Sequence, residues 1–259
     1  MEQPHLSLTS LKLEVPQEGS GRPLLLLRGS EPPGSSDKFI RALAERYKVI
    51  APWGPGFGSS DLPDDFDSIE DVVYAHLELM EKMDLADAIV VGLSFGGWIA
   101  AELAVRNTSR IKALVLVDAL GLRVGTPTDR PIADIYAMDD AELATSSYHN
   151  AEFGTWNAAD KSDAELLKFA RGRDAQARFG WKPFMHNPAL SRWLHRIDRP
   201  TLVAWGEQDR IAAQSLGKAY ASGIPNAQFR TVPDAGHFPH IERPEYLSGE
   251  IIRFADALE

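Results

Sequence analysis

Through the first 117 residues, short apolar runs alternate with longer stretches whose apolar positions recur at helical spacing. Residues 6–15 alternate apolar and polar side chains, which is typical of a half-buried strand. The run PLLLL at 23–27 is continuously apolar, as in a strand buried on both faces. Further strands are predicted over residues 48–51, 88–91 and 113–117. Helices are predicted over 36–46, from a cap at Asp67 or Ser68 to near Met83, and over 95–106. This rhythm predicts a parallel, doubly wound sheet of the α/β class.

This alternation of strand-like and helix-like runs stops between residues 121 and 195, where the sequence is helix-like and rich in bulky aromatic residues. Strand-like runs return at 201–205 and 227–232, and a terminal helix follows Pro244. A helical insertion between two strands of one sheet is a lid arrangement. We therefore expect an α/β core formed by residues 1–120 and 199–259, with residues 121–198 as a helical lid and not as a second independent domain.

Composition narrows the class of protein. The chain has 259 residues, 44% of them hydrophobic, which suits one large domain with a sizeable core. Its formal net charge of −10 makes nucleic acid and anionic membranes poor partners. With no cysteine, disulfides, thiolate metal sites and a cysteine nucleophile are excluded. No signal peptide and no run of about 20 apolar residues is found, so we expect a cytoplasmic protein, either monomer or homodimer.

The stretch AIVVGLSFGGWIAAELAV contains the pattern G-x-S-x-G at residues 92–96. A run of β-branched residues leads into it and a helix-forming run leads out, so Ser94 is predicted to stand on a tight strand-to-helix turn. Such a turn strains the backbone at the nucleophile and requires small neighbours, which Gly92, Gly96 and Gly97 provide. Because the turn opens a helix, the amide of Phe95 is placed to donate to a developing oxyanion.

These features resemble the α/β-hydrolase superfamily, in the lidded branch that includes carboxylesterases, C–C bond hydrolases and cofactor-free perhydrolases. The resemblance covers nearly the whole chain. It implies a mostly parallel eight-stranded sheet flanked by helices, with the lid inserted after the sixth strand. It also implies a nucleophile, an acid and a histidine in that order along the chain, which Ser94, Asp209 and His237 match.

His237 lies in Gly236-His237-Phe238-Pro239, which is similar to the family's late G-H-x-P loop, and a neutral imidazole there would take the proton from Ser94. Asp209 follows the strand-like run TLVAWG at the family's acid position. Two other carboxylates compete for that role, Glu207 in the same loop and Asp118 at the end of the preceding strand. His237, His240 and Glu242 could suggest a metal site, but Pro239 breaks the helix it would need. We expect no metal and no cofactor.

The sequence departs from the family in the loop that supplies the second oxyanion donor. Members usually carry His-Gly after the first buried strand, whereas this chain has Arg28-Gly29, with the amide of Ser30 aligned as the donor. Trp53 stands where an aspartate is common. We consider two interpretations of Arg28: a buried ion pair, with Glu31 as partner, or a solvated side chain at the loop edge.

The sequence predicts a carboxylesterase that forms an acyl-enzyme on Ser94 and acts on a small ester or related carbonyl compound. A C–C bond hydrolase of meta-cleavage-type products or a perhydrolase would use the same three residues, because the pocket decides the reaction. A non-catalytic ligand-binding protein on this fold is the alternative from another class. The substrate pocket is expected to include four aromatic residues, namely Phe57, Trp156, Trp181 and Phe238.

Overall fold

The computed structural model describes residues 4–126, 128–154 and 158–258. Within them, the main sheet has seven strands in the order β3-β5-β4-β6-β7-β8-β9. Every neighbouring pair is parallel except β3 with β5. The strands are β3 (Gln17–Glu18), β4 (Pro23–Leu27), β5 (Lys48–Ile50), β6 (Ala88–Leu93), β7 (Ile111–Val117), β8 (Thr201–Gly206) and β9 (Ala227–Val232). The predicted α/β class and mostly parallel sheet are confirmed.

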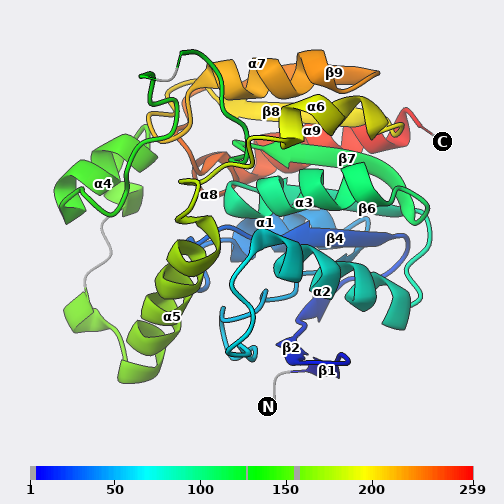
Figure 1. Cartoon of the computed structure of the whole chain (residues 1–259), viewed down its shortest axis with the longest axis horizontal. Helices are drawn as coiled ribbons and strands as arrows, with labels where there is room; N and C mark the ends of the chain where they lie inside the picture. Colours follow the sequence, from blue (N-terminus) through cyan, green and yellow to red (C-terminus); the bar gives the residue numbers. More distant parts are fainter. Residues whose placement is uncertain (1–3, 127, 155–157, 259) are drawn as a thin grey trace.

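Helices cover both faces of this sheet (Figure 1). The helices of the core are α1 (Asp37–Ala44), α2 (Ile69–Lys82), α3 (Phe95–Arg106), α7 (Gln214–Gly223), α8 (Pro239–Glu242) and α9 (Pro244–Asp256). One apolar core lies between the sheet and α2, α3 and α7, and the other between the sheet and α1 and α9. The strands β4 and β6–β8 are therefore buried on both faces, which explains their continuous apolar runs.

The predicted N-terminal strand over residues 6–15 is wrong. Instead, β1 (His5–Ser7) and β2 (Lys12–Glu14) form a separate antiparallel pair, joined by a turn in which the amide of Leu8 donates to the carbonyl of Leu11 at 2.8 Å. The alternation of apolar and polar residues is the same in one strand and in a hairpin, so it did not reveal the turn. This pair lies outside the main sheet, which has seven of the eight strands that the family resemblance implied.

Helix α2 begins where the sequence predicted. Ser68 is its N-cap, accepting a hydrogen bond from the amide of Asp71, and the Asp71 carboxylate accepts one from the amide of Ser68 at 3.0 Å. This reciprocal capping satisfies two amides that the first turn would otherwise leave unpaired.

In the segment between β7 and β8, the described residues before Asp140 form no helix, whereas the part after them is largely helical. Its first helices pack beside the carboxyl ends of the strands, and its last ones lie over the sheet (Figure 1). This segment contains α4 (Asp140–Ser147), η1 (Ala151–Gly154), η2 (Ala158–Asp160), α5 (Asp163–Gly180), α6 (Leu190–Trp193) and η3 (Leu194–Arg196). Helix α5 is tied to the loop after β5, because Arg171 donates to the Ser60 carbonyl at 3.0 Å and Arg178 to the Asp64 carbonyl at 2.6 Å. None of the helices so described is long and apolar enough to cross a membrane.

The central strand β6 meets α3 at unusually short range. A Cβ added to Gly92 would lie 2.5 Å from the Gly96 carbonyl oxygen, 2.6 Å from the Gly97 Cα and 2.7 Å from the Ala100 Cβ. Two of these atoms are backbone and cannot rotate away. The strand-to-helix turn that carries Ser94 therefore requires glycine at position 92.

We expect Gly92→Ala to lower the free energy of unfolding by about 1–3 kcal/mol, because the added methyl forces β6 and α3 apart. Gly249→Ala is the matched control. In α9, a Cβ at position 249 comes no closer than 3.4 Å to the flexible end of Arg253, so better helix propensity should raise stability by about 1 kcal/mol. Urea denaturation of both variants measures the difference, and equal effects would contradict this packing constraint.

His240 on α8 is a buried ionisable side chain whose charge state affects the stability of the fold. Its side chain is buried beside the ring of Phe39, with Nε2 3.8 Å from a carboxylate oxygen of Glu31. Burial lowers the pKa of His240 to about 4, and the charge of Glu31 only partly opposes that shift. The folded chain therefore holds this imidazole neutral at pH values where an unfolded chain would protonate it.

Stability should fall as the pH drops from about 6.5 to about 4, because only the unfolded chain takes up the proton in that window. The loss attributable to His240 is about 3 kcal/mol. Urea denaturation at pH 7 and pH 5 should show a smaller loss in His240→Asn than in the wild type. His195→Asn, at an exposed position, is the control with an unchanged loss. An unchanged loss in His240→Asn as well would show that His240 is not the group responsible.

Candidate active site

Ser94 occupies the turn between β6 and α3 with φ 50° and ψ −113°. This left-handed conformation is strained for a residue with a side chain. The turn is secured by the amide of Ser94, which donates to the Val117 carbonyl at 2.9 Å, and by the Ser94 carbonyl, which accepts from the amides of Gly97, Trp98 and Leu120. The predicted strand–turn–helix context of the G-x-S-x-G pattern is thus present in the structure.

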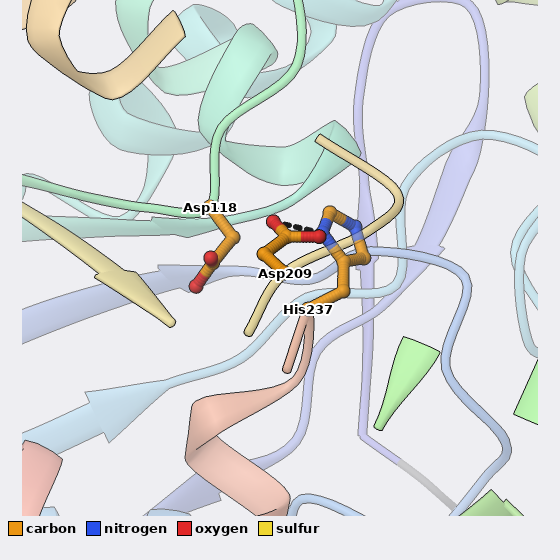
Figure 2. Close-up of side chains that lie close together, drawn as sticks. All are labelled: Asp118, Asp209 and His237. Atoms are coloured by element: carbon orange, nitrogen blue, oxygen red, sulfur yellow. Dashed lines mark hydrogen bonds and ion pairs between the residues drawn. The ribbon is translucent and has the colours of Figure 1, made fainter. Parts of the chain in front are cut away.

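The three predicted residues meet at the carboxyl ends of the strands. The Oγ atom of Ser94 lies 2.7 Å from Nε2 of His237, and Nδ1 of His237 lies 2.9 Å from a carboxylate oxygen of Asp209. Figure 2 shows the second of these contacts. The Asp209 side chain is fully buried and the His237 side chain is 3% exposed. Asp209 is held by the amides of Ile211 and Ala212, which donate to its other carboxylate oxygen at 2.8 and 2.9 Å.

The two rival carboxylates occupy different places. Glu207 is exposed and accepts from the side-chain amide of Gln208 at 2.9 Å. Asp118 is fully buried directly beside Asp209, but it is Asp209, and not Asp118, that accepts the hydrogen bond from Nδ1 of His237 (Figure 2). Asp118, Asp209 and His237 also form the one group of three possible metal ligands among the described residues. Both ring nitrogens of His237 are already hydrogen-bonded within the chain, so this group offers no free imidazole lone pair.

The loop after β4 lies against Ser94. A Cβ added to Gly29 would be 3.1 Å from the Ser94 Cβ, and Ser30 lines the same cavity as Ser94. Phe95 begins α3 immediately after Ser94, and its ring is buried. The predicted donors Ser30 and Phe95 are thus on the two segments that flank Ser94.

The two departures from the family contact each other. The guanidinium carbon of Arg28 lies 4.4 Å from the centre of the Trp53 ring, which is a cation–π contact. The predicted ion pair with Glu31 is wrong, because no carboxylate oxygen lies within 4.0 Å of the Arg28 guanidinium nitrogens in the described chain. Glu31 instead accepts from Ser36 Oγ at 2.9 Å. Burial lowers the pKa of Arg28, and the charge of Glu31 is the strongest opposing influence.

Ser94 and His237 open onto a cavity of about 590 Å³. Of the predicted pocket residues, Phe238 lines this cavity. Phe57 does not, because its ring is buried between Gly172 of α5 and the Phe95 ring. Trp181 is 58% exposed and does not line it either. Trp156 lies outside the described residues.

Most of the cavity wall comes from the segment between β7 and β8, and sequence reasoning named none of its described lining residues. The apolar lining includes Leu120, Ile132, Ile135, Leu143, Phe169 and Met185. Arg173 and Gln176 of α5 supply polar groups, and the Arg173 guanidinium lies over the Tyr136 ring at 5.1 Å. Their spacing of three on a predicted helix was the only available signal that they share a face.

The end of α4 is clamped to the loop that carries His237. Glu242 accepts from the amide of Gly236 at 2.7 Å and from the amides of His149 and Asn150 at 3.2 and 2.9 Å. The amide of His237 donates to the Ser147 carbonyl at 2.7 Å. One wall of the cavity is therefore positioned by the same carboxylate that positions the histidine loop.

Known proteins with related sequences and structures extend this picture. The chain is 29% identical to a 2-hydroxymuconate semialdehyde hydrolase of Pseudomonas putida, over 93% of this chain and 90% of that protein. It is 28% identical to lipase 3 of a Moraxella species, over 93% of this chain and 79% of that protein. A solved meta-cleavage product hydrolase mutant superimposes with a TM-score of 0.81 at 20% identity, covering 98% of both chains. The model of the alpha/beta hydrolase fold matches residues 23–244, so the chain belongs to the α/β-hydrolase family.

Proposed function

We propose that this α/β hydrolase is a serine hydrolase that cleaves carboxylic esters through an acyl-enzyme on Ser94. The observation that carries the proposal is the unbroken hydrogen-bonded chain from Ser94 through His237 to the buried carboxylate of Asp209, with contacts of 2.7 and 2.9 Å. These are the distances that proton transfer between a nucleophile and its general base requires. This series of hydrogen bonds ends at Ser94, which opens onto a cavity large enough for a small organic substrate.

In the proposed mechanism, Nε2 of His237 takes the proton of Ser94 as Oγ attacks the substrate carbonyl. The Asp209 carboxylate orients Nδ1–H and stabilises the imidazolium that results. The carbonyl oxygen becomes an oxyanion, to which we assign the amides of Phe95 and Ser30 as donors. His237 then gives the proton to the leaving alcohol, and a water molecule activated by the same imidazole releases the acid.

The cavity wall supports a small substrate with apolar groups. In this proposal, residues 121–198 act as a lid over a core of residues 1–120 and 199–259, with α4 and α5 forming much of the wall above Ser94. The cytoplasmic location, the monomeric or homodimeric state and the absence of nucleic-acid or membrane partners remain predictions from the sequence.

A fluorophosphonate probe should label the wild type and should not label Ser94→Ala, because the probe reacts only with an activated serine hydroxyl. Hydrolysis of short nitrophenyl esters should fall at least about 1,000-fold in Ser94→Ala and His237→Ala, and by a similar amount in Asp209→Asn. Ser222→Ala, at an exposed serine of α7, should keep wild-type labelling and turnover. A folded wild type that resists labelling would favour the non-catalytic, ligand-binding alternative.

A second candidate is hydrolysis of a C–C bond in a meta-cleavage-type product, and Arg173 is the observation that favours it. This arginine lines the cavity, and within the described chain no carboxylate lies within 4.0 Å of its guanidinium. A relative's substrate, a muconate semialdehyde, carries a carboxylate. A cation in a largely apolar cavity would favour a substrate that carries a carboxylate, whether it is a meta-cleavage-type product or an ester.

Arg173→Gln should lower kcat/KM for an ester whose acyl group ends in a carboxylate by about tenfold, and leave the matched neutral ester within about twofold. Lys218→Gln removes the same charge from an exposed position on α7, and neither ester should respond. Equal losses on both esters in Arg173→Gln would contradict a role in anion recognition. Product analysis with a ring-cleavage dienoate and with peracid formation then separates the C–C hydrolase and perhydrolase alternatives from the esterase.

A further inference from the structure

Asp118 is a buried carboxylate that the proposed mechanism does not use. It follows β7 with φ 44°, in the left-handed region, and its side chain is inaccessible to solvent. One carboxylate oxygen, Oδ1, accepts from the amide of Gly206 at 2.8 Å. The other, Oδ2, is buried and receives no hydrogen bond from any donor in the described chain. A buried charged oxygen without a donor would cost several kcal/mol.

The neighbour of Asp118 is another carboxylate. Figure 2 shows Asp118 beside Asp209, on the side away from His237. One oxygen of each carboxylate and one ring nitrogen of His237 lie within 4.8 Å of one another. The remaining charged group that acts on Asp118 is Glu242 of α8, which is also acidic. No lysine or arginine in the described chain pairs with Asp118 within 4.0 Å.

Two buried carboxylates this close cannot both be ionised without a cation between them. Asp209 accepts hydrogen bonds from two backbone amides and from Nδ1 of His237, and each of them stabilises the charged form. Asp118 accepts one. The proton therefore belongs on Asp118. Burial and then the charge of Asp209 raise the pKa of Asp118 well above its ordinary value, in agreement with the geometry.

We propose that Asp118 is a neutral positioning residue, protonated on Oδ2, which donates a hydrogen bond to the Asp209 carboxylate and holds it against His237. The catalytic part of this inference rests on the proposed function, whereas the location of the proton does not. The hydrogen bond gives Asp209 a further donor and leaves one negative charge, not two, beneath the histidine. The rotation of the Asp209 carboxylate is thereby restricted from the side opposite His237.

Infrared spectroscopy at pH 7 tests the proton directly, in protein labelled with ¹³C at the aspartate carboxyl carbons. The wild type minus Asp118→Asn difference should contain the carbonyl stretch of a protonated carboxylic acid. Asp84→Asn is the matched control, because Asp84 shares the left-handed φ, at 46°, and its side chain is 94% exposed. Its difference spectrum should contain only carboxylate bands. A carboxylate signature in the Asp118→Asn difference would overturn the proposal.

The pH profile of kcat/KM on a nitrophenyl ester tests the positioning role. The amide side chain introduced by Asp118→Asn keeps a neutral donor, so this variant should stay within about threefold of the wild type and leave the acid limb in place. If Asp118 were charged, its removal would move the acid limb to lower pH, because His237 would lose a nearby negative charge. Asp118→Ala lacks the donor and should lose about tenfold in kcat at nearly unchanged KM.

Thermal unfolding shows whether each variant is folded. If Asp118→Ala does not fold, the measurements on Asp118→Asn still decide whether Asp118 is charged. Wild-type kcat in a folded Asp118→Ala variant would overturn the positioning role. If the wild type hydrolyses no ester and takes up no fluorophosphonate, the proposed function fails. The infrared result then still decides whether Asp118 carries the proton.

Discussion

The close packing of β6 against α3 is the constraint on which the site depends. Ser94 can hold its left-handed conformation only because the residues around the turn lack side chains that would collide, as at Gly92 and Gly97. At Gly96 the same closeness extends to the Leu27 carbonyl, so the end of β4 packs directly on the turn. The loop with Gly29 and Ser30 therefore starts at a close backbone contact beside Ser94.

Electrostatics around the turn follow from the depth at which its charged groups are buried. Asp209 is stabilised by two amides and by His237, and we propose that Asp118 beside it stays neutral. In the loop after β4, Arg28 lies on the Trp53 ring and Glu31 lies near the neutral His240. Hydrogen bonds to Asp209 and Glu31 and the Trp53 ring beneath Arg28 stabilise these charged groups, and none of the three pairs with an oppositely charged lysine, arginine or carboxylate group within 4.0 Å in the described chain.

We propose that the segment between β7 and β8, which the core holds at several points, selects the substrate. Helix α5 is fastened to the loop after β5 through Arg171 and Arg178, and the end of α4 is fastened to the histidine loop through Glu242. Residues of both helices line the cavity above Ser94. The reaction and its specificity are therefore specified by different parts of the chain, with the proposed triad on the sheet and the cavity wall on the helices.

The sequence by itself determined the α/β class, the central strands and helices, and the strand–turn–helix context of Ser94. Local apolar periodicity and glycine spacing indicate those features, because both depend only on residues that are close together in the sequence. Asp209 and His237 were found because family-like loop motifs surround them. The tertiary structure alone decided which aromatic residues face the cavity, why Arg28 contacts Trp53 rather than Glu31, and that Asp118 lies against Asp209. Such contacts join residues tens of positions apart, and no local pattern records them, because they depend on how the strand ends and helices pack in three dimensions.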